Sequence, residues 1–235
     1  RMEMLRYLDV QNILDKNDLI LQESGCVGSE NERGNTYMKK IGIVTDSHSS
    51  ISQEEAEKLG IFVLPMPFYI DGECYYESVT LSRELFFEKL AAGADITTSQ
   101  PSPTAVMEIW DKALEQFEKI LYMPISSGLS GSYETAMMLA KDEAYEGRVL
   151  VVDDGQVAAP LHQMVLDTLD MIEKGYEAEQ IRDLLERAGD RMMIYIALQT
   201  LECLKKGGRV TPAAAALGSV FHIKPILKLQ TGKLD

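Results

Sequence analysis

The sequence predicts an α/β fold in which a mainly parallel β-sheet is flanked by helices. Short apolar runs at residues 41–44, 120–125 and 149–152 are typical of buried strands. Helical patterns separate these runs, and such an alternation favours parallel strands joined by helices. Ligands of these folds bind beyond the carboxyl ends of the strands, so the residues that follow each strand are the first candidates for a functional site.

Local signals predict the boundaries of the first elements. Serines stand directly before three helical patterns and are expected to cap them: Ser52, Ser82 and Ser102. Gly60 is expected to end the first of these helices. Two prolines interrupt a strand predicted over residues 61–69, and Asp71-Gly72 after it is typical of a β-hairpin turn.

The second half of the chain predicts another, smaller unit. Its expected elements are helices at residues 161–173 and 177–188, a strand at 192–198, a short helix at 201–206, an alanine-rich helix from 211 and a strand at 222–229. The predicted organisation is an extension over residues 1–37, a first α/β domain over 38–158 and a second α/β domain over 159–235. We expect the second domain to be incomplete at its C-terminal end.

Charge and composition exclude several classes of function. The chain of 235 residues has a formal net charge of −14, which disfavours binding to nucleic acids and to anionic lipid surfaces. Its three cysteines lie far apart, which fits a reducing cytoplasm and gives no spacing for a metal. No apolar run is long enough to span a bilayer.

The most informative stretch is the turn over residues 126–133, called the serine turn below, where the apolar run 120–125 meets a helical pattern. It contains four serines and two glycines. Glycine allows close approach to a ligand, serine hydroxyls donate hydrogen bonds, and a helix start favours an anion. The turn therefore predicts a site for a small anionic head group, most simply a carboxylate. The alternative is a capped helix start with spare serines.

Two further polar clusters follow predicted strands. Thr97, Thr98 and Ser99 form one, and Asp46 with Ser47 belongs to the other. Since the carboxyl ends of parallel strands share one edge of a sheet, we expect these clusters to meet the serine turn there.

Catalytic motifs are a weaker interpretation of the same residues. The nucleophile elbow of serine hydrolases, Gly-x-Ser-x-Gly, is displaced by one residue at Gly128-Leu129-Ser130-Gly131-Ser132. Of the three histidines only His48, at a strand end, is placed to approach the site. Phosphate-binding loop and dinucleotide fingerprints are absent. Asp46, Asp153 and Asp154 are better explained as caps and turn formers than as magnesium ligands, and no metal site is expected.

Five motifs together resemble the DegV family over residues 38–235. They are Val44-Thr45-Asp46-Ser47, Thr98-Ser99-Gln100-Pro101-Ser102-Pro103, residues 126–133, Leu204-Lys205-Lys206-Gly207-Gly208-Arg209 and Ile223-Lys224-Pro225-Ile226-Leu227. The resemblance implies a two-domain α/β protein that buries one long-chain fatty acid and needs no cofactor. It also implies a substrate-carrying role: a separate ATP-dependent kinase subunit phosphorylates the bound carboxylate, and an acyltransferase uses the acyl phosphate for phospholipid synthesis.

The resemblance also assigns residues. The family's carboxylate contacts match Thr97, Thr98, Ser126, Ser127 and Gly128, with Thr98 and Ser127 favoured within their pairs. Arg209 matches an arginine linked to phosphate or kinase engagement. Secondary candidates are Asp46, Ser47, Ser99 and Ser130.

Besides the extension before Met38, which has no recognised counterpart, the chain departs from the family pattern in two places. Asp153-Asp154 stands where Asp-Ser is usual, and a C-terminal portion that carries a further arginine and histidine does not follow Asp235. Two other functions stay open: a serine esterase or acyltransferase that uses Ser127 or Ser130, and a regulator that senses a lipid without passing it on.

Overall fold

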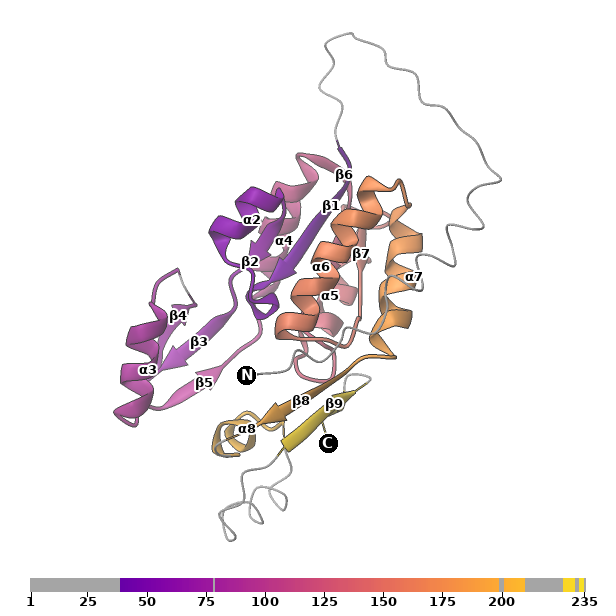
Figure 1. Cartoon of the computed structure of the whole chain (residues 1–235). Coiled ribbons are helices and arrows are strands. Elements are labelled where there is room, and N and C mark those ends of the chain that lie inside the picture. The colour runs from indigo at the N-terminus through magenta and orange to yellow at the C-terminus, as the bar shows by residue number, and fades with distance from the viewer. Residues whose placement is uncertain (1–38, 78, 199–200, 210–225, 231–232, 235) are drawn as a thin grey trace. The chain divides into compact units, whose positions relative to one another are not determined.

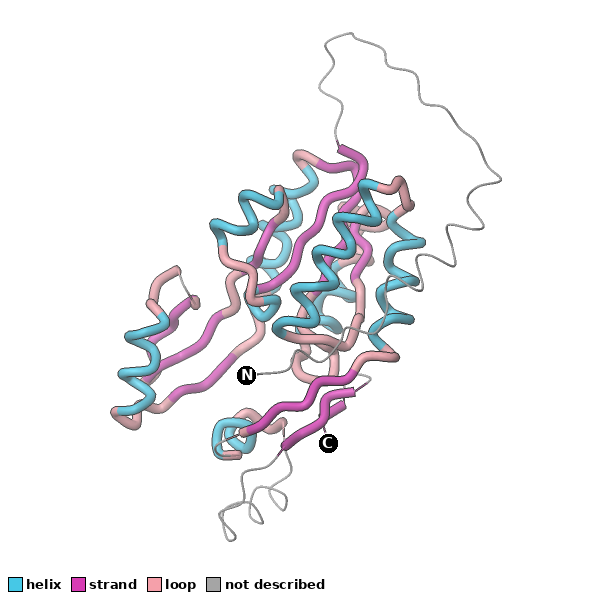
Figure 2. The backbone as a smooth tube through the Cα atoms, in the orientation of Figure 1, coloured by secondary structure: helices cyan, strands magenta, loops and turns pink. Residues whose placement is uncertain are grey.

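A computed structural model describes residues 39–77, 79–198, 201–209, 226–230 and 233–234 of the chain. The extension predicted over residues 1–37 lies outside this part. So do the alanine-rich helix predicted from residue 211 and the start of the strand predicted from residue 222. Figures 1 and 2 show the described helices and strands.

The largest sheet has four parallel strands, as the sequence predicts. They are β1 (Lys39–Asp46), β2 (Phe62–Leu64), β6 (Phe117–Met123) and β7 (Val149–Val151), in the order β2-β1-β6-β7. The central strands are buried on both faces, which explains why their sequences are continuous apolar runs. The carboxyl ends of β1 and β6 meet at one edge, where a site was expected.

Helices cover both faces of this sheet (Figure 1). They are α2 (Gln53–Leu59), α4 (Pro103–Leu114), α5 (Ser132–Leu139), α6 (Ala158–Glu173) and α7 (Ala178–Gly189). On one face Trp110 of α4 packs edge to face on Tyr122 of β6, with ring centroids 5.3 Å apart. On the other, the Thr168 hydroxyl of α6 contacts the sulfur of Met123. Since Tyr122 and Met123 are consecutive in β6, their side chains point to opposite faces.

The helices α6 and α7 lie after the predicted domain boundary at residue 158, yet they pack on the sheet that precedes it. The helix α7 contacts β6 and β7, and α6 contacts β1 and the short helix η1 (Ser47–Ser49).

A second sheet is antiparallel and contains one of the predicted polar clusters. Its strands are β3 (Pro67–Ile70), β4 (Glu73–Tyr76) and β5 (Ile96–Thr98), in the order β4-β3-β5. The predicted hairpin turn is confirmed, with positive φ at Asp71 (52°) and Gly72 (86°). The expectation that residues 97–99 follow a strand of the parallel sheet is wrong, because Thr97 and Thr98 pair antiparallel with β3. The helix α3 (Arg83–Ala91) follows β4.

The smaller C-terminal part has a three-stranded antiparallel sheet. It is formed by β8 (Met193–Ala197), β9 (Ile226–Gln230) and β10 (Lys233–Leu234), in the order β10-β9-β8. The predicted short helix is α8 (Glu202–Lys206), and it contacts β5.

The predicted helix caps are confirmed. The hydroxyls of Ser52, Ser82 and Ser102 each accept the backbone N–H three residues later. Gly60 ends α2 in the left-handed conformation with φ at 68°. These caps fix the chain entry into α2, α3 and α4, and two of the capping serines also line the cavity described next.

Candidate functional site

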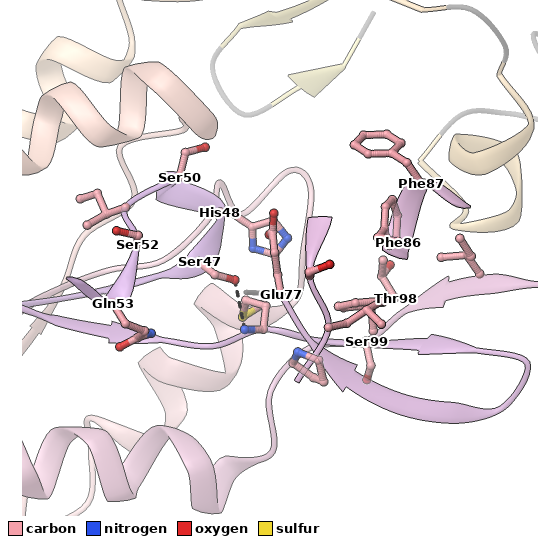
Figure 3. Close-up of a pocket in the computed structure, with 17 residues that line it drawn as sticks. Ser47, His48, Ser50, Ser52, Gln53, Glu77, Phe86, Phe87, Thr98 and Ser99 are labelled. Atoms are coloured by element: carbon pink, nitrogen blue, oxygen red, sulfur yellow. Dashed lines mark hydrogen bonds between the residues drawn. The ribbon is translucent and has the colours of Figure 1, made fainter. Parts of the chain in front are cut away.

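A cavity of about 550 Å³ lies where η1 and α2 meet β3, α3 and β5 (Figure 3). This volume is typical of small-molecule sites. The lining includes hydroxyls, from Ser47, Ser50, Ser52, Ser82, Thr98 and Ser99. It also includes apolar side chains, from Ile51, Met66, Pro67, Phe68, Leu81, Phe86, Phe87 and Ile96. A cavity with this lining suits an elongated apolar molecule that ends in a polar group.

Aromatic packing shapes the apolar wall. Phe86 of α3 meets Phe68 of β3 edge to face at 5.6 Å between ring centroids, and Phe86 meets Phe87 at 5.5 Å. Edge-to-face pairs hold rings in defined orientations. The wall is therefore preformed between the helix and the antiparallel sheet.

The hydroxyls that line the cavity differ in whether they already form hydrogen bonds within the protein. Ser47 Oγ accepts the N–H of Met66 at 3.1 Å, and Ser99 Oγ donates to the carbonyl of Gln100 at 3.1 Å. The Thr98 hydroxyl has no hydrogen-bond partner among the described residues, so it is available to a ligand. Within the predicted pair, Thr98 lines the cavity and Thr97 does not.

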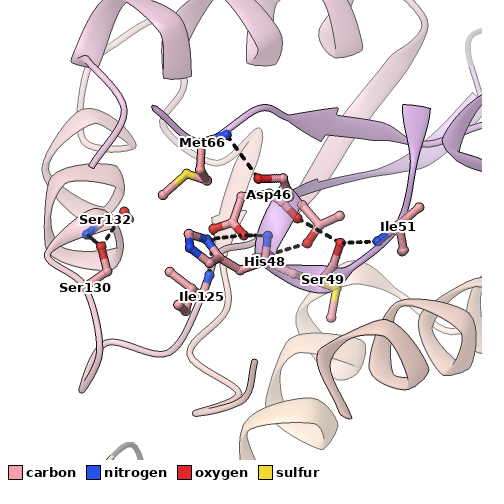
Figure 4. Close-up of polar contacts among 11 residues, drawn as sticks. Asp46, His48, Ser49, Ile51, Met66, Ile125, Ser130 and Ser132 are labelled. Carbon is pink, nitrogen blue, oxygen red and sulfur yellow. Dashed lines mark hydrogen bonds and ion pairs between the residues drawn. The ribbon is translucent and has the colours of Figure 1, made fainter. Parts of the chain in front are cut away.

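Asp46 joins the cavity to the serine turn (Figure 4). Its side chain is fully buried. Oδ1 accepts the backbone N–H of His48 at 2.9 Å and lies 3.3 Å from Nδ1 of that imidazole, and Oδ2 accepts the N–H of Ile125 at 2.8 Å. Asp46 thus holds η1, which lines the cavity, against the residue before Ser126.

Several backbone N–H groups of the serine turn, residues 126–133, are satisfied inside the protein. The N–H of Ser127 donates to Asp153 Oδ1 at 3.3 Å, and that of Gly128 donates to Ser126 Oγ at 3.3 Å. The N–H groups of Leu129 and Ser130 donate to the Ser126 carbonyl. The sequence suggested that these N–H groups would be free for an anion. Residues 127–130 can therefore donate to a ligand only through the side-chain hydroxyls of Ser127 and Ser130.

The cavity lining brings together only some of the predicted site residues. Ser47, Thr98 and Ser99 belong to it, whereas Asp46, Thr97, Ser126, Ser127, Gly128, Ser130 and Arg209 do not. Ser126 is buried, and Ser130 Oγ lies 2.8 Å from Ser132 Oγ. No hydrogen bond among the described residues joins Ser127 or Ser130 to an imidazole, so the geometry gives the esterase alternative no support. The apolar wall of α3 was not foreseen.

Arg209 reaches the serine turn from the C-terminal part. Its Nε donates to the carbonyl of Leu129 at 3.0 Å, and its Nη1 donates to the carbonyl of Gly207. Two exposed lysines precede it in α8, Lys205 and Lys206. A basic group therefore lies beside the serine turn of a strongly acidic chain.

A buried carboxyl lies behind the turn. Asp154 is 1% exposed, and its Oδ2 has no partner among the described residues. Burial, and then the nearby carboxylates of Asp153, Asp46 and Glu186, raise the pKa of Asp154 to about 8. Asp154 therefore holds its proton at neutral pH in the folded protein.

We expect Asp154→Asn to stabilise the protein at alkaline pH. Between about pH 4 and about pH 8 folded Asp154 keeps a proton that the unfolded chain releases, so the free energy of unfolding falls as pH rises. Asparagine stays neutral at every pH. The free energy of unfolding of the variant, relative to that of the wild type, should therefore rise by at least about 1 kcal/mol when the pH is raised from about 5 to about 8. Urea denaturation at both pH values measures this gain. An equal gain for the exposed control Asp190→Asn, or none for Asp154→Asn, would contradict the assignment.

The described residues contain no group of three or more histidine, cysteine, aspartate or glutamate side chains placed to hold a metal ion. In the same part of the chain, no helix has both the length and the apolar character needed to cross a membrane.

Comparison with known proteins identifies the family. A family model described as "Uncharacterised protein, DegV family" matches residues 40–235. The chain belongs to the DegV family. A DegV domain-containing protein of Caldanaerobacter subterraneus is 32% identical over 197 residues, which are 84% of this chain and 70% of that protein.

Solved structures of DegV proteins share the fold. A fatty-acid-binding DegV family protein from Thermus thermophilus is 34% identical with a TM-score of 0.74, over 83% of this chain and 70% of that one. DegV of Bacillus subtilis, described as a fatty acid binding protein, is 26% identical with a TM-score of 0.72, over 84% and 70%. The predicted α/β class with a parallel sheet and a smaller C-terminal part is therefore confirmed.

Proposed function

We propose that this DegV protein binds one long-chain fatty acid in the cavity and presents its carboxyl group to a separate ATP-dependent kinase. The observation that carries the proposal is the cavity itself, whose lining combines eight apolar side chains with six hydroxyls. The solved relatives from Thermus thermophilus and Bacillus subtilis are both described as fatty-acid-binding proteins.

The cavity lining accounts for affinity. Each buried methylene contributes roughly 0.8 kcal/mol before the costs of association, so the apolar wall supplies most of the binding free energy. The hydroxyl of Thr98 supplies a hydrogen bond to the acid group, and we propose the Ser127 hydroxyl of the serine turn as a second donor. A hydrogen bond to a charged acceptor contributes about 1.5–3 kcal/mol.

In this proposal the protein itself performs no catalysis. It carries the substrate, the kinase subunit transfers the phosphoryl group, and an acyltransferase consumes the acyl phosphate for phospholipid synthesis. Since the kinase depends on ATP, we place the complex in the bacterial cytoplasm. The net charge of −14 means that the acidic chain needs a local basic group to meet a phosphorylated head group, and Arg209 beside the serine turn supplies one.

Mass spectrometry of the protein purified without added lipid tests fatty-acid binding. We expect one acyl chain per protein molecule under native conditions, and a free fatty acid in the solvent extract. A delipidated sample should take up palmitic acid in a one-to-one ratio. Absence of acyl chains from the purified protein, together with no uptake, would overturn the proposal.

Arg209→Ala tests the kinase part. The side chain lies outside the cavity lining, so fatty-acid binding should persist, whereas phosphorylation of the bound acid by the kinase should fall roughly tenfold or more with the loss of a charged contact. Acyl phosphate formation, trapped as a hydroxamate, measures turnover. The exposed Arg191→Ala is the control and should keep full turnover. Full turnover with Arg209→Ala would contradict the role in kinase engagement. Arg209 would then be a surface residue whose side chain only donates a hydrogen bond to the Leu129 carbonyl.

A further inference from the structure

His48 is the one residue of the cavity lining, within the described part of the chain, whose side chain can carry a positive charge. Among the side chains that the structure describes, no lysine or arginine lines this cavity, and the single carboxylate is that of Glu77. Figure 3 shows the imidazole of His48 drawn among the lining residues, with Ser47 and Ser52 to one side and Thr98 to the other. An acid group that enters the cavity therefore has one candidate for a charged partner.

The surroundings of His48 fix its ring. Its Nδ1 lies 3.3 Å from Asp46 Oδ1, which also accepts the backbone N–H of His48 at 2.9 Å. Since a carboxylate only accepts hydrogen bonds, the contact favours the tautomer that carries its proton on Nδ1. Nε2 has no hydrogen-bond partner among the described residues, and the side chain is 37% exposed. The ring is oriented from inside the protein and open at the other nitrogen.

We propose that His48 binds the acid group of the ligand through Nε2, and that Asp46 is the positioning residue for its ring. This inference rests on the proposed fatty-acid binding and adds a specificity determinant to it. An imidazolium donates to a carboxylate, and a neutral imidazole accepts from a carboxylic acid, so the pair holds one proton in either form. The hydroxyl of Thr98, on the same cavity, can donate to the second oxygen of the acid.

The arrangement distinguishes an acid from its neutral derivatives. A methyl ester carries the same chain but neither a negative charge nor a proton to share with Nε2. The apolar wall holds both ligands alike, so His48 affects only the difference between them. Glu77 acts in the opposite sense, because its charge in the same cavity repels a carboxylate.

The experiment compares palmitic acid with methyl palmitate on the full chain, by displacement of a fluorescent fatty acid. We expect His48→Phe to weaken binding of the acid roughly tenfold or more and binding of the ester less than about threefold. His48→Ala serves if the phenylalanine variant does not fold. His162→Gln removes the imidazole of α6, which pairs with Glu55 outside the cavity, and should change neither affinity. Glu77→Gln should tighten binding of the acid by roughly two- to fivefold.

The outcomes separate the inference from the proposed function. If the wild type binds neither ligand, fatty-acid binding is overturned and the inference with it. If the wild type binds the acid and His48→Phe binds it equally well, fatty-acid binding stands and the inference is wrong. An equal loss for acid and ester would also overturn the inference, because it would assign His48 to the shape of the cavity.

A spectroscopic measurement checks the ring directly. Two-bond proton–nitrogen NMR spectra of the wild type should show the Nε2 resonance of His48 shifting when palmitic acid is added, with Nδ1 staying protonated. Methyl palmitate should leave the Nε2 resonance nearly unchanged. If palmitic acid binds and the Nε2 chemical shift stays unchanged, the proposed contact is contradicted.

Discussion

Thr98→Val should lower the affinity for palmitic acid by roughly ten- to a hundredfold, the equivalent of one hydrogen bond to a charged acceptor. Valine keeps the shape and the strand preference of threonine at the end of β5, so the antiparallel pairing of Thr98 with Phe68 should persist. The hydroxyl has no partner among the described residues, and its removal leaves no buried group unsatisfied. Displacement of a fluorescent fatty acid measures the change.

Two further variants show whether the effect belongs to the cavity. Thr104→Val, on the exposed first turn of α4, is the control and should bind as the wild type does. Thr97→Val decides within the predicted pair: because Thr97 lies outside the cavity lining, it should lose far less affinity than Thr98→Val. A loss at Thr97 equal to that at Thr98, or none at Thr98, would contradict the assignment of the hydroxyl.

Gly189→Ala should destabilise the protein by about 3 kcal/mol, because a Cβ at this position would lie 1.9 Å from the carbonyl oxygen of Asp154. That neighbour is backbone and cannot turn aside. The Gly189 carbonyl also accepts Gln156 Nε2 at 3.2 Å, and the Gln156 carbonyl accepts the N–H of Ser126 at 2.9 Å. The close approach of α7 therefore supports the loop on which the serine turn rests.

Gly131→Ala is the matched control for this prediction. Its added Cβ would meet only Gln100 Oε1, at 2.9 Å, and that side chain can move away. The loss should stay below about 1 kcal/mol, as expected for alanine at the start of α5. Urea denaturation of both variants gives the comparison. Similar free energies of unfolding for Gly189→Ala and Gly131→Ala would show that α7 can shift without cost.

Local signals predicted much of the fold because their physics is local. A serine that caps a helix needs only the N–H three residues later, and Ser52, Ser82 and Ser102 all behave so. The turn Asp71-Gly72 likewise needs only backbone freedom at two positions. Continuous apolar runs predicted the buried parallel strands. A strand that is buried on both faces has no position for a polar side chain, so its own sequence shows the burial.

Pairing between distant segments could not be predicted in this way. The strand β5 has three residues, two of them threonines, and its sequence does not show that it joins β3 rather than the parallel sheet. Its partner β3 begins at Pro67, directly after the break that separates it from β2. The resulting antiparallel sheet, with α3, forms the apolar wall, so the wall was missed with it.

For the candidate site, the sequence selected some residues that line the cavity but could not show which of their atoms are free to contact a ligand. It selected Thr98, Ser99 and Ser47, which line the cavity. It did not show that the Asp153 carboxylate accepts a hydrogen bond from the N–H of Ser127, because these residues are 26 positions apart in the sequence. Likewise the Asp46 carboxylate, a secondary candidate for ligand contact, accepts hydrogen bonds from the backbone N–H groups of His48 and Ile125.

Photoaffinity labelling tests the central claim most directly, with a long-chain fatty acid that carries a diazirine in the middle of its chain. The claim predicts that light attaches the probe to the apolar wall, in peptides that contain Met66, Phe68 or Phe86, and that excess palmitic acid prevents the attachment. Labelling that excess palmitic acid prevents, but that falls only on other parts of the chain, would contradict the claim.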